Sequence, residues 1–139
     1  MNIKNIALIS ALISVGVAVQ SCSVIESQKV RLVDAKMATA VDADFMPVGV
    51  TDMFPAGTER VTCWIKWKDS KINTEIIAKW HYLTDDVHIV DYPFSIPKRE
   101  GSGGITITMP GGKKFPAGSY KVDLYLEKRL IKTLQFRVG

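Results

Sequence analysis

Short stretches in which apolar and polar residues alternate make up most of the chain after residue 22. The clearest is residues 119–127, where Tyr120, Val122 and Leu124 fall on one side of an extended chain and mostly polar residues on the other. Successive side chains of a strand point to opposite faces, so this period of two predicts strands with one buried and one solvated face. The expected strands are residues 30–40, 60–67, 74–83, 87–96, 104–109, 119–127 and 130–138.

Helical periodicity is nearly absent from the same region, and Gly, Pro and Asp separate the strands. This pattern predicts an all-β domain of about seven strands, arranged as two antiparallel sheets packed face to face. Residues 42–55 are the least regular and are expected to form either a loop or an extra edge strand. The glycine-rich residues 101–104 and 111–114 are expected to connect strands, because neither leads into a helix as a phosphate-binding loop does.

A four-residue repeat, Phe-Pro-Ala-Gly, occurs at residues 54–57 and 115–118. A proline followed by a glycine two positions later favours a turn, and each copy precedes an expected strand. These two strands run in the same direction in an antiparallel sandwich of this kind. We therefore expect both turns at the same end of the domain, with a structural role.

Three expected core residues resemble those of the immunoglobulin and fibronectin type III domains. Cys63, Trp80 and Tyr120 fall on the second, third and sixth strands, where antibody domains carry a Cys, a Trp and a Tyr-x-Cys. The resemblance implies an immunoglobulin-like antiparallel β-sandwich over residues 30–139, with the Tyr120 hydroxyl bonded to nearby backbone. Val122 stands where the second Cys would be, so no disulfide is implied, and the fold alone implies no function.

The N-terminus carries a secretory pattern, with Lys4 before an apolar run at residues 6–19. As a helix this run would be about 21 Å long, which is too short for a hydrocarbon core of ~30 Å. The run ends in Val19-Gln20-Ser21-Cys22, which resembles the lipobox of bacterial lipoproteins. An ordinary cleaved signal with a chance cysteine is the alternative.

The lipoprotein resemblance implies that Cys22 carries acyl chains such as palmitate and becomes the first residue of the mature chain. It divides the sequence into a signal peptide, which is the only expected helix (residues 1–21), an acylated tether (22–29) and the sandwich (30–139). Ser23 follows Cys22, whereas lipoproteins retained at the inner membrane typically have Asp there. The resemblance therefore favours an outer membrane, with the domain facing the periplasm.

The overall charge is mildly basic, with 18 Lys and Arg against 14 Asp and Glu. No basic run interleaved with aromatics indicates a nucleic-acid partner. The basic residues do gather in three connections that the strand directions place at the end where the first strand begins. These candidates for contact with an anionic lipid surface or an acidic partner are Lys68, Lys71, Lys98, Arg99, Lys128 and Arg129. Solvated loop tips are the alternative.

Candidate chemistry is sparse, and no catalytic constellation and no cofactor motif emerge. If Cys22 is acylated, Cys63 has no disulfide partner, and on a core face it is expected to be an inert thiol. His81 and His88 would face each other across a hairpin; they are weak candidates for zinc and more typical of a solvated surface. Trp64 and Tyr125 are expected on outward faces, as a candidate ligand patch; the alternative is a reversed register that puts Trp64 inside and Trp67 at the strand end.

The sequence thus favours a membrane-anchored envelope lipoprotein that acts as a non-catalytic protein-binding or assembly module. Its expected partners are the membrane, through the acyl chains on Cys22, and another envelope protein. Recognition of a glycan or another small envelope ligand through exposed aromatics is the alternative. An enzyme or a metal-binding protein comes third.

Overall fold

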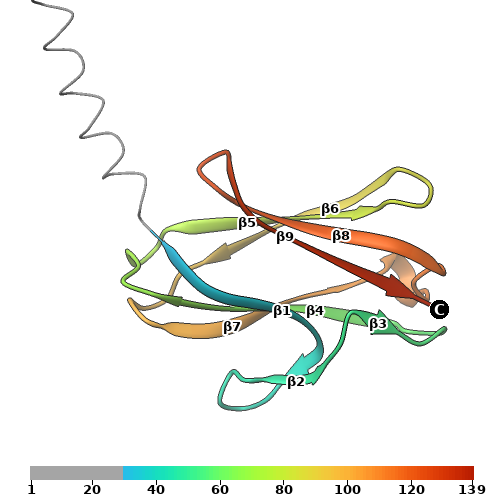
Figure 1. Cartoon of the computed structure of the whole chain (residues 1–139), viewed down its shortest axis with the longest axis horizontal. Coiled ribbons are helices and arrows are strands. Elements are labelled where there is room, and N and C mark those ends of the chain that lie inside the picture. Colours follow the sequence, from blue (N-terminus) through green and yellow to red (C-terminus); the bar gives the residue numbers. More distant parts are fainter. Residues whose placement is uncertain (1–29) are drawn as a thin grey trace, which may run out of the picture.

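The computed structural model describes residues 30–139, which form two β-sheets packed face to face (Figure 1). A four-stranded sheet has the order β2-β1-β4-β7, and a five-stranded sheet has the order β3-β9-β8-β5-β6. The predicted signal peptide, Cys22 and the tether lie outside the described residues. The elements are β1 (Arg31–Val41), β2 (Pro47–Val50), β3 (Met53–Phe54), β4 (Arg60–Lys68), β5 (Glu75–Tyr82), β6 (Val87–Ser95), β7 (Gly101–Thr108), the 3₁₀ helix η1 (Pro110–Gly112), β8 (Gly118–Leu126) and β9 (Arg129–Val138).

The all-β sandwich predicted from the alternation is confirmed. All seven expected strands are present, as β1 and β4 to β9. Residues 42–55 add two short strands, β2 and β3, of which β3 pairs with β9 in parallel and so departs from the otherwise antiparallel pattern. Within residues 30–139, no helix has the length and apolar character needed to cross a bilayer.

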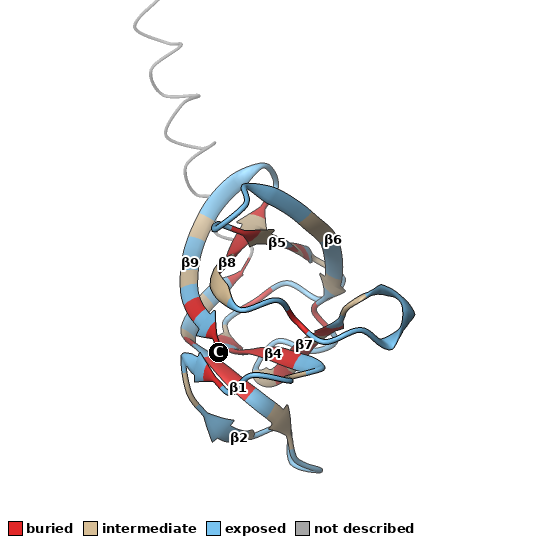
Figure 2. Ribbon diagram, turned by 90° about the vertical axis from the view of Figure 1, so that its right-hand side faces the viewer, coloured by how far each residue is buried: buried red, intermediate tan, exposed pale blue. Residues whose placement is uncertain are grey.

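The core lies between the sheets, where Figure 2 shows the buried segments facing one another. Trp67, Trp80 and Tyr120 are its largest fully buried side chains. The Tyr120 ring stacks on Phe136 with centroids 5.0 Å apart, and the Trp80 ring meets Phe136 edge-on at 6.0 Å. Stacked and edge-on ring pairs add to the free energy gained from burying the rings themselves.

The two Phe-Pro-Ala-Gly turns lie at the same end of the domain, as predicted. The Phe115 N–H donates to the Thr58 carbonyl at 2.8 Å, which joins one turn directly to the residue after the other. The Tyr120 hydroxyl donates to the Pro116 carbonyl inside the second turn. This is the tyrosine corner implied by the immunoglobulin resemblance, and it fixes the start of β8 against the end of the sandwich.

Strand β7 begins three residues earlier than predicted, because residues 101–103 belong to the strand and not to a connection. Close packing explains the glycines of this strand. A Cβ added at Gly103 would come within 3.1 Å of the Phe94 ring, and one at Gly104 within 2.9 Å of Val41. The missing side chains let neighbouring segments approach the strand, which is a common reason for glycine inside a strand.

The β1–β2 hairpin folds across the outer face of the four-stranded sheet and lies below it in Figure 1. Its turn is held by Asp42, whose carboxylate accepts from the N–H groups of Asp44 and Met46 at 2.8 and 3.0 Å. The Phe45 carbonyl in this turn accepts from the Trp64 indole at 2.8 Å and from the Ser102 hydroxyl at 2.7 Å. The hairpin is therefore fastened to β4 and β7.

Candidate functional site

The predicted patch of Trp64 and Tyr125 does not exist. Trp64 is only 3% exposed, because the β1–β2 hairpin covers the outward face of β4 on which it lies. Tyr125 is half-buried on β8, in the other sheet, and the Lys79 ammonium lies 4.6 Å from its ring centroid. The two aromatics belong to different sheets, so they do not form one ligand surface, and the glycan alternative loses its main support.

His81 and His88 do pair across the β5–β6 hairpin, as predicted. Each imidazole contacts a different carboxylate, however. The His81 Nε2 lies 2.9 Å from Asp86, and the His88 Nε2 lies 2.7 Å from Asp91. No group of three or more His, Cys, Asp or Glu that could hold a metal occurs within residues 30–139. The arrangement is that of two separate surface pairs.

Cys63 is fully buried on the core face of β4. Burial raises the pKa of its thiol from 9.0 to about 12, because the thiolate would lose its hydration. A thiol of this kind is neither ionised nor accessible at neutral pH, so Cys63 has the properties of a structural residue.

The six predicted basic residues do gather at the end of the sandwich where β1 begins. Antiparallel pairing of Arg31 with Lys68, and of Trp67 with Gly101, brings the β4–β5 and β6–β7 connections to this end. Pairing of Ile76 with Leu126 brings the β8–β9 turn to it. We call this surface the basic end: Lys68, Lys71, Lys98, Arg99, Lys128 and Arg129. All except the half-buried Lys68 are exposed.

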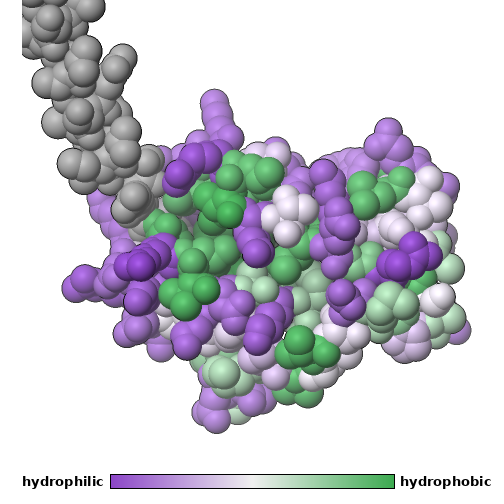
Figure 3. Space-filling model, in the orientation of Figure 1, coloured by the Kyte–Doolittle hydropathy of each residue, from purple (hydrophilic) through white to green (hydrophobic). Residues whose placement is uncertain are grey.

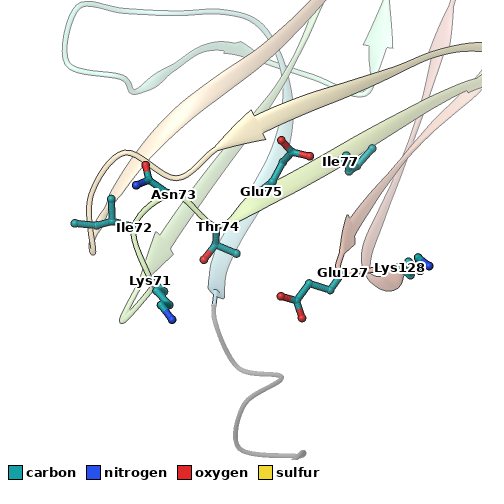
Figure 4. A pocket seen from close by; sticks show the side chains of 8 residues that line it. All are labelled: Lys71, Ile72, Asn73, Thr74, Glu75, Ile77, Glu127 and Lys128. Carbon is teal, nitrogen blue, oxygen red and sulfur yellow. The ribbon is translucent and has the colours of Figure 1, made fainter.

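A shallow pocket of about 500 Å³ lies at the basic end, between the β4–β5 connection and the β8–β9 turn (Figure 4). Lys71 and Lys128 line it together with two acids, Glu75 and Glu127. The acids make the pocket itself mixed in charge. Two of the six basic residues therefore lie beside acids, and the excess of positive charge at this end comes from Lys68, Lys98, Arg99 and Arg129.

The start of the described chain is attached to the basic end. Val30 is buried, and the N–H of Arg31 donates to the Ser70 hydroxyl at 3.2 Å. The Arg31 guanidinium also lies 3.6 Å from the Asp69 carboxylate. The described chain therefore begins at the basic end.

A group of exposed apolar side chains that the sequence analysis did not identify lies on the β1–β2 hairpin and the strand that follows. Five of the eleven large apolar side chains that are exposed within residues 30–139 fall in this short segment. We call them the hairpin surface: Phe45, Met46, Val48, Val50 and Met53, each 45–61% exposed. Figure 3 shows an apolar area at the lower edge of the domain, where Figure 1 places β2.

Comparison with known proteins finds the fold but no sequence family. No protein-family model matches the chain, and no curated protein matches it. An immunoglobulin-like protein of Pseudomonas aeruginosa has a similar crystal structure, with a TM-score of 0.56 and 10% identity over 81% of this chain and 98% of that chain. The domain is therefore an immunoglobulin-like β-sandwich, as the resemblance implied.

Two weaker structural matches have TM-scores below 0.5. A DNA glycosylase of Pseudomonas fluorescens, bound to DNA, matches with a TM-score of 0.45 and 10% identity over 80% of this chain and 30% of that chain. A Niemann-Pick type C2 protein of the Japanese carpenter ant matches with a TM-score of 0.40 and 14% identity over 80% of this chain and 92% of that chain. Function must therefore be argued from the surface of this domain.

Proposed function

We propose that this protein is a lipoprotein of the bacterial cell envelope, and that its immunoglobulin-like domain is a non-catalytic module that binds another envelope protein. The apolar run, the lipobox-like Val-Gln-Ser-Cys and Ser23 support acylation at Cys22 and an outer-membrane location facing the periplasm. Several acyl chains hold a protein firmly to a bilayer, at ~0.8 kcal/mol for each buried CH₂.

The hairpin surface is the observation that carries the binding function. Exposed apolar patches on soluble domains typically mark contacts with other molecules. Here the backbone beneath the patch is held in place by the bonds of Trp64 and Ser102 to Phe45. A partner would meet a surface that is already ordered, so less conformational entropy is lost on binding.

Acylation is tested by growing cells that express the full chain with an alkyne analogue of palmitate and measuring label on the protein. We expect label on the wild type and none on Cys22→Ala, which should be released from membranes or stall during processing. Cys63→Ala is the matched control and should be labelled like the wild type. A Cys22→Ala protein that is fully processed and still membrane-bound after a salt wash would contradict the proposed anchor.

Binding is tested in the same cells with a photo-crosslinking amino acid at Met53 and, as a control, at the exposed Asp85. We expect one defined adduct from position 53, identified by mass spectrometry as an envelope protein, and none from position 85. Val50→Asp should abolish the adduct because it places a charge in the apolar patch, whereas Val87→Asp should not. Equal adducts in both variants, or none in the wild type, would contradict binding through the hairpin surface.

A further inference from the structure

Strand β7 differs from the other edge strands of the described domain because its sequence has none of the features that usually protect an edge from further pairing. Strand β2 is four residues long with Gly49 at a positive φ of 64°, and β3 has two residues. Strand β6 carries Asp91 and Pro93. Edge strands usually carry charges or proline, or are short, because an open edge pairs with other chains. Strand β7 has eight residues, Gly-Ser-Gly-Gly-Ile-Thr-Ile-Thr, with neither charge nor proline.

The free edge of β7 offers backbone groups in a regular row. Strand β7 pairs with β4 along its whole length and ends the sheet, so it has no strand partner on the other side among residues 30–139. In an antiparallel pair every second residue points its N–H and C=O away from the partner strand. Groups arranged in this way match the backbone of one further extended strand, which is the geometry of β-strand addition.

A groove of about 600 Å³ with a mixed polar and apolar lining lies beside the C-terminal half of β7, between this strand and β6. Ile89, Val90, Ile107 and Met109 line it, together with Tyr92, which is 45% exposed. Beside the N-terminal half of β7, side chains fill the space between the edges of the two sheets. There the Phe94 ring meets Trp67 at 5.7 Å and lies against Gly103.

We propose that β7 is a peptide-binding edge, on which an extended segment of a partner protein adds as a further strand. Apolar side chains at alternate positions of that segment would lie in the groove, while its backbone pairs with β7. The segment is expected to be apolar at every second residue and free of proline along the paired edge. The inference rests on the proposed binding function but uses a surface separate from the hairpin surface.

A second copy of this chain fits the groove less well than such a peptide. In an antiparallel pair of two β7 strands over their full length, Gly101 and Gly103 of the second copy would lie near Ile107. Glycine has no side chain with which to fill the groove, so Tyr92, the exposed apolar side chain of the groove, would stay uncovered. A segment with large apolar residues at these positions would cover Tyr92.

The test uses the full-length protein in detergent and a synthetic peptide of alternating threonine and isoleucine, as long as β7 and flanked by lysines. Amide hydrogen exchange should slow in residues 101–108 when the peptide is added, and exchange in β2 should not change. Two further peptides carry backbone N-methyl groups either on every threonine or on every isoleucine. One of them should lose binding and the other keep it, because only one edge of an added strand faces β7.

Tyr92→Lys and Val87→Lys form a matched pair, since both residues lie on β6 and are 45% and 49% exposed, but only Tyr92 lines the groove. Tyr92→Lys should weaken peptide binding about tenfold or more, because it places a charge among apolar side chains. Val87→Lys should leave binding unchanged.

Equal effects of the two lysine variants, unchanged exchange in β7, or equal binding of both methylated peptides would overturn the inference. So would a dimer in sedimentation that Tyr92→Lys dissociates, because the occupant would then be a second copy. Crosslinking at Met53 in cells is measured separately. Its persistence when peptide binding fails would overturn this inference alone and leave the proposed function standing.

Discussion

The Trp80 indole is fully buried between the sheets, and its N–H has no hydrogen-bond partner within residues 30–139. Trp80→Ala should destabilise the domain by about 3–5 kcal/mol, because it removes a large core side chain and leaves a cavity. Trp80→Phe should cost much less, since a ring remains in the core and an unsatisfied donor worth about 1–3 kcal/mol is removed. Urea unfolding of the two variants measures the difference, and an unchanged midpoint for Trp80→Ala would show that this residue is not part of the core.

Two buried groups make the domain sensitive to high pH. Burial raises the pKa of Cys63 from 9.0 to about 12, and burial together with the neighbouring Tyr82 raises the pKa of Tyr120 from 10.0 to about 12. Between about pH 9 and pH 12 the folded protein keeps protons on these two groups that the unfolded chain releases. The stabilisation is therefore complete below pH 9 and is lost as the pH rises towards 12.

The first part of this alkaline loss belongs to Cys63 alone, because the thiol of the unfolded chain begins to ionise before the tyrosines do. Between pH 9 and 10 the unfolding free energy should fall by about 1 kcal/mol more in the wild type than in Cys63→Ala. Denaturant unfolding at the two pH values measures this. Identical slopes for the two proteins would show that the thiol already ionises in the folded state.

At the scale of elements, strands were predictable where one face is buried and the other is exposed to solvent. Strand β8 shows this clearly, because alternate residues such as Tyr120 and Val122 are buried along it. The cover over Trp64 was not predictable, because it comes from the β1–β2 hairpin, which is distant in sequence and folds over the outer face. The glycines at the start of β7 were wrongly predicted to form a connection for a similar reason. The segments that pack against them, and so require glycine, are also distant in sequence.

The repeated turn gives a matched pair of substitutions at Gly57 and Gly118, which have positive φ values of 90° and 145°. A side chain strains the backbone at both positions. At Gly57 the nearest atoms to an added Cβ are 4.0 Å away, whereas at Gly118 the Thr84 hydroxyl would be 2.5 Å and the Tyr82 ring 2.8 Å away. Gly57→Ala should cost about 1–2 kcal/mol, and Gly118→Ala clearly more. Thermal unfolding of both variants tests this, and equal losses would show that the crowding around Gly118 relaxes freely.

At the scale of the whole molecule, the two ends of the sandwich differ in what they carry: one is joined to the tether, and the other holds the repeated turns. The tether joins at the basic end, through Val30 and Arg31. The Phe-Pro-Ala-Gly turns lie at the opposite end. The eight tether residues, 22–29, span at most ~26–29 Å when extended. If Cys22 is acylated, the basic end is therefore held near the lipid surface, and the opposite end points away from it.

We expect the basic end to face the anionic lipid surface and so to orient the domain. Each basic residue near such a surface contributes up to about 1 kcal/mol, and the attraction decays over a Debye length of ~8–10 Å.

Flotation with liposomes measures the binding of the unacylated protein that lacks residues 1–22. Binding should occur to anionic vesicles but not to neutral ones, and high salt should abolish it. Lys98→Glu combined with Lys128→Glu should also abolish binding, whereas Lys113→Glu with Lys114→Glu, the same charge change at the opposite end, should preserve it. An absence of binding at low salt, or equal losses in both double variants, would exclude orientation by lipid and leave an acidic protein partner or solvated loop tips as the explanation for the basic end.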